Sequence, residues 1–237
     1  MKNLIYPDIC FICKNFFEYK GLKEEKFKFP GDFNEVFCDV LCPECLSKVF
    51  FVQGRIKDLF ADKKFLSSIN SPFIYQDSIV DIVHLLKYNY KTFFAEKISW
   101  FILKTYLEFY KNQVHDLAVF VPMHKKAFRK RGFNQTYLIA IETQNLAKKY
   151  RVDFPEINKN VLIKIKNTRS QAGLKKEERR KNISNVFKVK NSFLVKGKKV
   201  LIIDDVCTTG STLEECAKTL VKSGAQCVDA ITFARAV

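Results

Sequence analysis

The spacing of apolar side chains changes along this chain and separates it into regions of different expected structure. Residues 1 to about 50 contain glycine and proline punctuation but no long periodic stretch, which is typical of a small, turn-rich unit. From residue 76 onward, apolar side chains recur every three or four positions over 76–88, and again over about 92–110. This period predicts two helices that each bury one face.

The second half of the chain alternates short apolar runs with longer stretches of helical period. Predicted strands cover 117–122, 161–165, 199–204 and 227–234, and predicted helices cover 134–148, 175–183 and 211–223. Strands separated by helices favour a mostly parallel sheet covered by helices on both faces. We therefore expect an α/β fold.

Length and composition suit one large domain with a small appendage. The chain has 237 residues, of which 47% are hydrophobic, enough for one substantial core. We expect a four-cysteine metal-binding unit over 1–50, a helical connecting segment packed on the main domain over 51–115, and the α/β domain over 116–237.

Membrane and export signals are missing from the apolar pattern. No apolar run approaches the roughly 20 residues that a membrane helix needs. Residues 1–10 lack the long apolar core of a secretory signal. The sequence therefore predicts no integral membrane span and a cytoplasmic location.

Positive charge is concentrated in the middle of the chain. The formal net charge is +16, and residues 121–199 hold 22 Lys and Arg against 5 Asp and Glu. A local basic excess of this kind attracts phosphate-bearing partners, nucleic acid above all. The alternative is a lysine-rich solvated surface, because lysine is a common solubilising residue.

Five of the eight cysteines lie within the first 45 residues. Cys10 and Cys13 form one C-x2-C knuckle and Cys42 and Cys45 form a second, the arrangement of a tetrathiolate zinc site. Cys38 is a rival ligand, although it lacks the knuckle spacing. Because four sulfurs close the tetrahedral shell, the zinc is expected to be structural. The remaining three cysteines are expected to serve as small apolar residues.

Candidate ligand-binding chemistry lies in "LIIDDVCTTGSTL", residues 201–213. Asp204 and Asp205 end an apolar strand, where open α/β sheets place ligands, and two carboxylates there can accept hydrogen bonds from a sugar diol. The following 208–212 turn offers hydroxyls and N–H groups at a helix start, a cradle for phosphate. Together they fit a 5-phosphorylated ribose. The alternative is a strand end followed by an ordinary helix cap.

This stretch resembles the phosphoribosyl diphosphate motif of the type I phosphoribosyltransferases. The resemblance implies a magnesium complex of 5-phosphoribosyl diphosphate, with Asp204 and Asp205 as candidate catalytic residues at the ribose hydroxyls. The ligand-binding set that it implies is Asp204, Asp205, Val206, Cys207, Thr208, Thr209, Gly210, Ser211 and Thr212. Purine-salvage members carry an acid at the position of Thr208, and threonine cannot take up a proton there. The acceptor therefore stays open.

A basic segment, "VPMHKKAFRKRGFNQ" at 121–135, follows a predicted strand. His124 and Lys125 are candidates for the diphosphate. The candidate nucleic-acid contacts are Lys126, Arg129, Lys130, Arg131, Phe133, Asn134, Arg169 and Arg179. Phe128 and Phe133 are interleaved with the cations, as in single-strand binding surfaces that stack bases. The alternative places both phenylalanines in the core and leaves the cations solvated.

Several motifs occur in a fixed order along nearly the whole chain: the four-cysteine unit, "LLKY", "VPMHKKAFRKRGFNQ", "TRSQAGL", "ERRKN" and "LIIDDVCTTGSTL". In this order they resemble the ComF family. The resemblance implies a zinc-finger-bearing, phosphoribosyltransferase-like competence protein. It implies handling of incoming single-stranded DNA on the cytoplasmic side, at the inner face of the membrane and beside a helicase-type partner.

Two other functions stay open on the sequence. The intact acid pair and phosphate loop suit an active phosphoribosyltransferase that acts on an unidentified base or nucleotide. The cysteine unit suits an adaptor that docks a partner protein. Whether the chain turns over a substrate, and its oligomeric state, are not encoded in these motifs.

Overall fold

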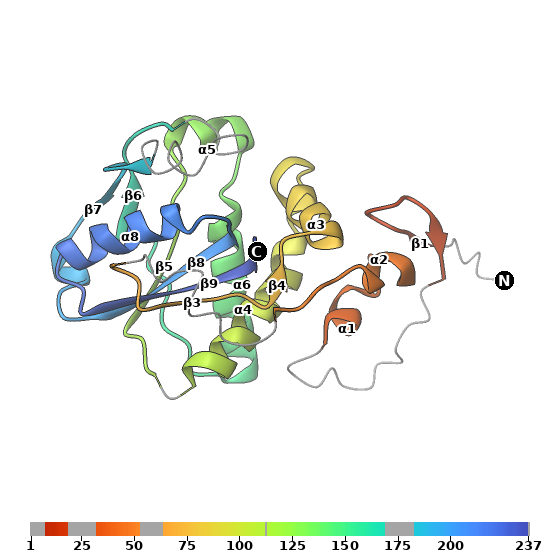
Figure 1. Cartoon of the computed structure of the whole chain (residues 1–237), viewed down its shortest axis with the longest axis horizontal. Coiled ribbons are helices and arrows are strands. Elements are labelled where there is room, and N and C mark those ends of the chain that lie inside the picture. The colour runs from red at the N-terminus through yellow and green to blue at the C-terminus, as the bar shows by residue number, and fades with distance from the viewer. Residues whose placement is uncertain (1–7, 19–31, 53–63, 112, 169–182, 237) are drawn as a thin grey trace.

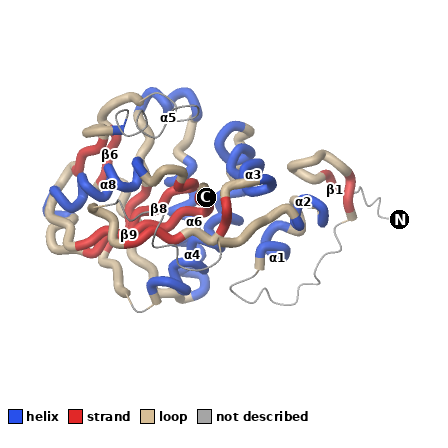
Figure 2. The backbone as a smooth tube through the Cα atoms, in the orientation of Figure 1, coloured by secondary structure: helices blue, strands red, loops and turns tan. Residues whose placement is uncertain are grey.

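The chain folds around a five-stranded sheet whose strands all run parallel (Figures 1 and 2). The computed structural model describes residues 8–18, 32–52, 64–111, 113–168 and 183–236. The strands are β3 (Ser68–Asn70), β4 (Phe73–Ile74), β5 (Leu117–Phe120), β8 (Lys199–Cys207) and β9 (Cys227–Arg235). Their order is β3-β9-β8-β5, with β4 also paired to β9. The predicted α/β class is confirmed.

Helices cover both faces of this sheet. They are α3 (Asp77–Tyr88), α4 (Phe94–Tyr110), α6 (Gln135–Tyr150) and α8 (Ser211–Lys222). A further helix, α5 (Lys125–Arg131), buries none of its residues. Side chains along β8 alternate between the two faces: Leu201 and Ile203 join the core formed with α3, α4 and α6, whereas Val200 and Ile202 join the core formed with α8. Both faces of β8 are therefore buried, which explains its continuous apolar run.

Two features of the sheet differ from the sequence prediction. The run at 161–165 does form a strand, β6 (Leu162–Lys164), but it pairs antiparallel with β7 (Phe187–Val189) in a separate two-stranded sheet. The segment at 51–115, expected to be helical, also supplies β3 and β4 to the central sheet. Both strands have three residues or fewer, too short to show a period-two pattern. Most of the helix predicted at 175–183 lies outside the described residues.

The N-terminal unit shares its core with the rest of the protein. It contains β1 (Asp8–Ile9), β2 (Phe16–Phe17), α1 (Phe33–Phe37) and α2 (Pro43–Ser47). Asp32 begins α1 with a capping box, in which it exchanges hydrogen bonds with Glu35. The Phe37 ring stacks on Phe101 of α4, and Phe33 meets Phe73 of β4 edge-on. The unit is thus anchored by aromatic packing as well as by its cysteines.

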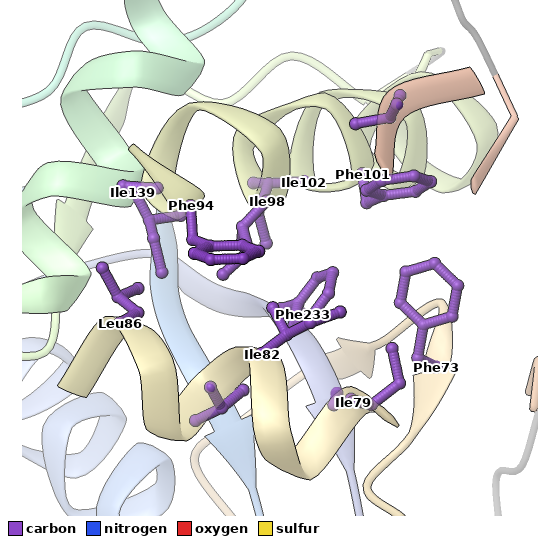
Figure 3. Close-up of a cluster of buried hydrophobic side chains, with 14 of the residues drawn as sticks. Phe73, Ile79, Ile82, Leu86, Phe94, Ile98, Phe101, Ile102, Ile139 and Phe233 are labelled. Carbon is purple, nitrogen blue, oxygen red and sulfur yellow. The ribbon is translucent and has the colours of Figure 1, made fainter. Parts of the chain in front are cut away.

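Helix α3 lies between this unit and the sheet, as Figure 1 shows. Its buried face, with Ile79, Ile82 and Leu86, meets side chains of α4 and β9 in the cluster of Figure 3. At its first turn, the Ser78 hydroxyl donates to the backbone carbonyl of Cys45 over 2.7 Å. In the described part of the chain, no helix combines the length and the apolar character that crossing a bilayer requires.

Candidate functional site

The candidate site begins with the acid pair at the carboxyl end of β8. Because β8 runs parallel to β5 and β9, its last residues reach the edge of the sheet where α/β proteins bind ligands. Asp204 and Asp205 are only 7% and 4% exposed. The backbone N–H of Asp205 donates to Oδ1 of Asp204 over 2.9 Å. Two buried acids side by side require compensation from a cation, a proton or a ligand.

Lys87 of α3 supplies part of that compensation through an ion pair with Asp205. Burial opposes charge on both partners, but their mutual attraction outweighs it. The pKa of Lys87 is therefore raised and that of Asp205 lowered. For Asp204, burial and then repulsion from Asp205 raise the pKa well above its ordinary value. The pair thus combines a charged Asp205 with an Asp204 that retains a proton far more readily than a normal carboxyl group.

The turn after β8 leads directly into the N-terminus of α8. Gly210 adopts a left-handed conformation with φ of 67°, and α8 starts at the next residue. The hydroxyls of Thr209 and Ser211 lie 2.9 Å apart. A twelve-residue helix presents N–H groups and the positive end of its dipole to this turn. Of the other predicted ligand residues here, Val206 is half-buried, and Cys207 is 2% exposed and ends the strand.

Helix α5 presents an exposed basic surface after β5. The His124 ring caps the helix, with Nδ1 accepting from the N–H of Lys126 over 3.2 Å. Four cations on this helix are exposed: Lys125, Lys126, Arg129 and Lys130. Phe128 is 47% exposed among them. We call Lys125–Lys130 the α5 basic surface.

The other predicted nucleic-acid residues, at the last position of α5 and just after it, are less accessible. Arg131 lies over the Tyr88 ring and donates to Gln135, and Phe133 packs partly on the main core. Asn134 is buried, and its side chain caps α6 and donates to a backbone carbonyl, which makes it a structural residue in this fold. Arg169 and Arg179 lie outside the described residues.

Four of the N-terminal cysteines meet at one point. The sulfurs of Cys10, Cys13, Cys42 and Cys45 all lie within 4.8 Å of one another, and the Cys13 and Cys42 sulfurs are 3.6 Å apart. Tetrahedral zinc with bonds near 2.3 Å separates its sulfurs by about 3.8 Å. The arrangement can therefore hold a metal ion. The Cys38 sulfur instead faces the backbone carbonyl of Glu35, at 3.3 Å.

Within the cysteine cluster the electrostatics favour a thiolate at Cys10, whereas burial and the neighbouring sulfurs raise the pKa of Cys45. Burial alone would raise the pKa of Cys10, but hydrogen bonds from the backbone N–H groups of Cys42, Cys13 and Ile12 lower it to about 7. Backbone N–H groups aimed at sulfur are usual around bound metal because they stabilise the thiolate form. The donor set and its surroundings both fit a metal centre.

The sequence analysis did not assign Lys87 to the site. Lys87 lies in the motif "LLKY", and its place on a helix over 76–88 was predicted. A lysine on the polar side of an amphipathic helix normally points to solvent, however, and nothing local identifies a partner 118 positions further on. Lys164 of β6 is a second lysine that Asp204 influences electrostatically: burial lowers its pKa, while attraction from Cys216 and Asp204 opposes the shift. Its ammonium group donates to Thr168 and lies over the Phe187 ring.

The region that contains the acid pair matches a known family of protein domains. Residues 145–236 match the phosphoribosyl transferase domain family, and the matched region contains the acid pair, the 208–212 turn and strands β8 and β9. The parallel sheet and the position of the acid pair agree with that match. The protein therefore has a phosphoribosyltransferase-like domain.

Named relatives narrow the class further. Competence protein F of Haemophilus influenzae is 37% identical over 49% of this chain and 48% of its own length. The DNA utilization protein YhgH of Escherichia coli K12 is 29% identical over 65% of this chain and 66% of its own. The chain thus spans about half the length of the first relative and about two thirds of the second. Competence protein ComFC of Bacillus subtilis is 25% identical over 98% of this chain and 96% of its own. The chain is therefore similar to proteins named for competence and for DNA utilization, and its similarity to ComFC extends over nearly its whole length.

Proposed function

We propose that this protein acts in natural transformation as a DNA-handling factor that carries a binding site for magnesium 5-phosphoribosyl diphosphate. The observation that carries the proposal is the buried acid pair directly before a phosphate-sized turn, one strand away from the α5 basic surface. The names of the three relatives, which refer to competence and to DNA utilization, support the biological setting. The proposed location is the cytoplasm, at the inner face of the membrane.

In the proposed sugar-phosphate site, the acid pair accepts hydrogen bonds from the two ribose hydroxyls. The 208–212 turn binds the 5-phosphate, and His124 and Lys125 face the diphosphate from the end of β5. When bound, magnesium neutralises charge on the diphosphate and so favours its departure. The residues of the chain bind and orient the ligand, which is the main contribution of proteins to such reactions. Thr208 supplies no acid for a purine base, so we leave the acceptor unassigned.

In the proposed DNA site, the α5 basic surface binds single-stranded phosphates and Phe128 stacks on a base. Its cations are exposed, and Phe128 offers a ring face between them, which is the usual combination for binding without sequence preference. Arg131 stays within the proposal as a partly covered cation at the edge of this surface. Arg169 and Arg179 stay predictions from the sequence, as does a helicase-type partner.

We propose zinc as the metal of the four-cysteine cluster, in a structural role. Four thiolates close the coordination shell, so no position is left for substrate. The cluster lies beside the aromatic core that joins α1 to α4, which suits a metal that holds the unit in place.

Calorimetry with magnesium 5-phosphoribosyl diphosphate tests the sugar-phosphate site. The unchanged protein should bind with one site per chain, and Asp204→Asn/Asp205→Asn should lose the heat of binding. A Lys148→Gln variant, exposed at the end of α6, is the matched control. Absence of binding by the unchanged protein, or equal binding by the acid-pair variant, would count against the site.

Salt-dependent binding of a fluorescent oligothymidine tests the DNA site. Lys126→Gln/Arg129→Gln/Lys130→Gln should weaken binding and reduce the salt slope by about two, since each single-strand phosphate contact contributes roughly 0.7. Lys148→Gln/Lys149→Gln, at the far end of α6, removes charge without touching the α5 basic surface. Equal losses in both variants would assign binding to net charge alone.

A further inference from the structure

The last strand of the sheet ends in an arginine that the proposed function does not use. Arg235 is 3% exposed, and its Nε and Nη2 atoms are buried with no hydrogen-bond partner among the described residues. A buried guanidinium without partners is costly, because its charge has lost water and gained nothing in exchange. Such a group calls for a physical explanation.

The position of Arg235 in the sheet suggests an explanation for its burial. In register, Arg235 lies beside Cys207 of β8 on one side and Ile74 of β4 on the other, so it is flanked by strands at the carboxyl edge. Cys207 immediately precedes the 208–212 turn, and the N–H of Ala236 donates to its carbonyl over 2.9 Å. The arginine is therefore at the same edge as the acid pair and the phosphate turn.

The surrounding charges leave the guanidinium unsatisfied. Burial lowers the pKa of Arg235, and the neighbouring Cys207 thiol opposes that shift. Among the described residues, no carboxylate forms an ion pair with it. The acid pair lies near the end of the neighbouring strand β8, and there Asp205 is already paired with Lys87.

The strand order separates this arginine from the proposed diphosphate position. The sheet runs β9-β8-β5, so β5, which leads to His124 and Lys125, is on one side of the acid pair, and β9 is on the other. A ligand lying across the end of β8 with its diphosphate toward β5 has its opposite side toward Arg235. An arginine fork suits a phosphate or carboxylate, to which it can donate two parallel hydrogen bonds.

We propose that Arg235 binds an oxyanion, a phosphate or carboxylate group, at the β9 side of the sheet's carboxyl edge. The proposal extends the sugar-phosphate site and rests on it for the orientation of the ligand. The oxyanion belongs either to the phosphoribosyl ligand itself or to a second, anionic molecule that approaches from the side opposite the diphosphate. In the second case, the acceptor of the proposed transferase is an anionic compound, not a neutral base.

The experiment compares Arg235→Met, which keeps the volume and removes the charge, with Arg235→Lys, which keeps the charge and loses the fork. The exposed Arg151→Met is the control. Without ligand, Arg235→Met should melt at or above the temperature of the unchanged protein, because a buried unpaired charge has been removed. A structural arginine would give a lower melting temperature.

Calorimetry then separates the two sources of the oxyanion. If the oxyanion is part of the phosphoribosyl ligand, Arg235→Met should weaken magnesium 5-phosphoribosyl diphosphate about tenfold to a hundredfold, the value of one or two charge-assisted hydrogen bonds. If it belongs to a second molecule, that binding should be unchanged, while inorganic phosphate binds the ligand-saturated unchanged protein and not Arg235→Met. Arg235→Lys should fall between the two.

Two results would overturn the proposal: Arg235→Met destabilises the protein and leaves all anion binding intact, or it changes neither stability nor binding. Failure of the proposed function has a different signature, because the unchanged protein would then not bind 5-phosphoribosyl diphosphate at all. In that event, titration of the ligand-free protein with inorganic phosphate still tests Arg235. Phosphate binding that persists in Arg235→Met would reject the site.

Discussion

Lys87, in the last turn of α3, forms an ion pair with the buried carboxylate of Asp205 at the end of β8. Nine residues earlier, the same helix receives the N-terminal unit through the hydrogen bond from Ser78 to Cys45. A single helix therefore contacts both the acid pair and the metal-binding unit. The stability of the acid pair consequently depends on a segment distant in sequence from the phosphoribosyltransferase-like domain.

Removing the Lys87 charge should strongly destabilise the protein. Lys87→Met leaves Asp205 as a buried carboxylate without its cation, and loss of one partner from such a pair costs about 3–5 kcal/mol of the free energy of unfolding. Urea unfolding measures this change. The double variant Lys87→Met/Asp205→Asn should recover much of the lost free energy of unfolding. The control is Lys148→Met, exposed on α6, whose free energy of unfolding should stay within about 0.5 kcal/mol of that of the unchanged protein. A Lys87→Met protein of normal stability would contradict the ion pair.

The two adjacent acids should respond to pH in opposite directions. The raised pKa of Asp204 means that the folded protein keeps a proton that the unfolded chain releases above about pH 4. This group's stabilising contribution is fully present below that pH and is lost as the pH rises. Asp204→Asn should therefore gain stability over the unchanged protein as pH increases, by at most about 1.4 kcal/mol per unit.

The stability that Asp205 contributes depends on pH in the opposite direction. Its lowered pKa contributes stability above the unfolded value and loses it as the pH falls through the folded value. Asp205→Asn should therefore destabilise the protein at neutral pH and differ little in strong acid. Urea unfolding between pH 4 and pH 8 compares the two variants. Parallel curves for both would show that the acids are not electrostatically distinct.

The sequence predicted the parts of this protein whose signal is local. The apolar run of β8, the helical period of α3 and the two cysteine knuckles each lie within a few residues, and all three were confirmed. The pairing of Lys87 with Asp205 was not predicted, because it depends on how α3 packs against the sheet. Arg235 was missed for the same reason. An arginine at the end of an apolar strand is normally expected to be exposed to solvent, and only its neighbours in the fold show that it is buried.

The core that the N-terminal unit shares with the rest of the protein was not predicted from the sequence either. Residues 1–50 have too little apolar content for a core of their own, so a metal was the expected source of stability. In the structure, the rings of Phe33 and Phe37 also pack on Phe73 and Phe101. Contacts between aromatic residues so far apart in sequence leave no periodic pattern, so they can be seen only in the folded chain.

Metal analysis should find one zinc ion per chain, held by the four clustered cysteines. Cys45→Ser should lose zinc, and because the cluster adjoins the aromatic core, it should also lower the melting temperature of the whole protein. Cys38→Ser is the matched control, since this sulfur faces the carbonyl of Glu35 outside the cluster. Plasma emission spectrometry with calorimetric melting measures both effects. Zinc loss in Cys38→Ser with retention in Cys45→Ser would reverse the assignment.

The hydrogen bond at the start of α3 should stabilise the metal-binding unit. Ser78→Ala removes this donor from the Cys45 carbonyl, which keeps the N–H of Lys48 at 3.3 Å, so the loss should cost about 0.5–1.5 kcal/mol. We expect a lower free energy of unfolding and faster removal of zinc by a coloured chelator. Ser47→Ala is a suitable comparison, because this hydroxyl makes an exposed hydrogen bond within α2. Identical chelation rates in the two variants would mean that the Ser78 bond does not hold the unit.

Two phenylalanines, one within the α5 basic surface and one just after α5, should separate DNA binding from stability. Phe128 is 47% exposed on the α5 basic surface, whereas Phe133 packs on the main core and meets Tyr90 edge-on. Phe128→Ala should weaken oligothymidine binding by about 1–3 kcal/mol, the value of one base stacked on an aromatic ring, with little change in melting temperature. Phe133→Ala should lower the free energy of unfolding by about 1–3 kcal/mol because packed ring contacts are lost.

Fluorescence anisotropy measures the affinity for oligothymidine, and thermal unfolding measures the stability of each variant. Normal DNA binding by a folded Phe128→Ala protein would remove base stacking from the proposal and leave only the phosphate contacts.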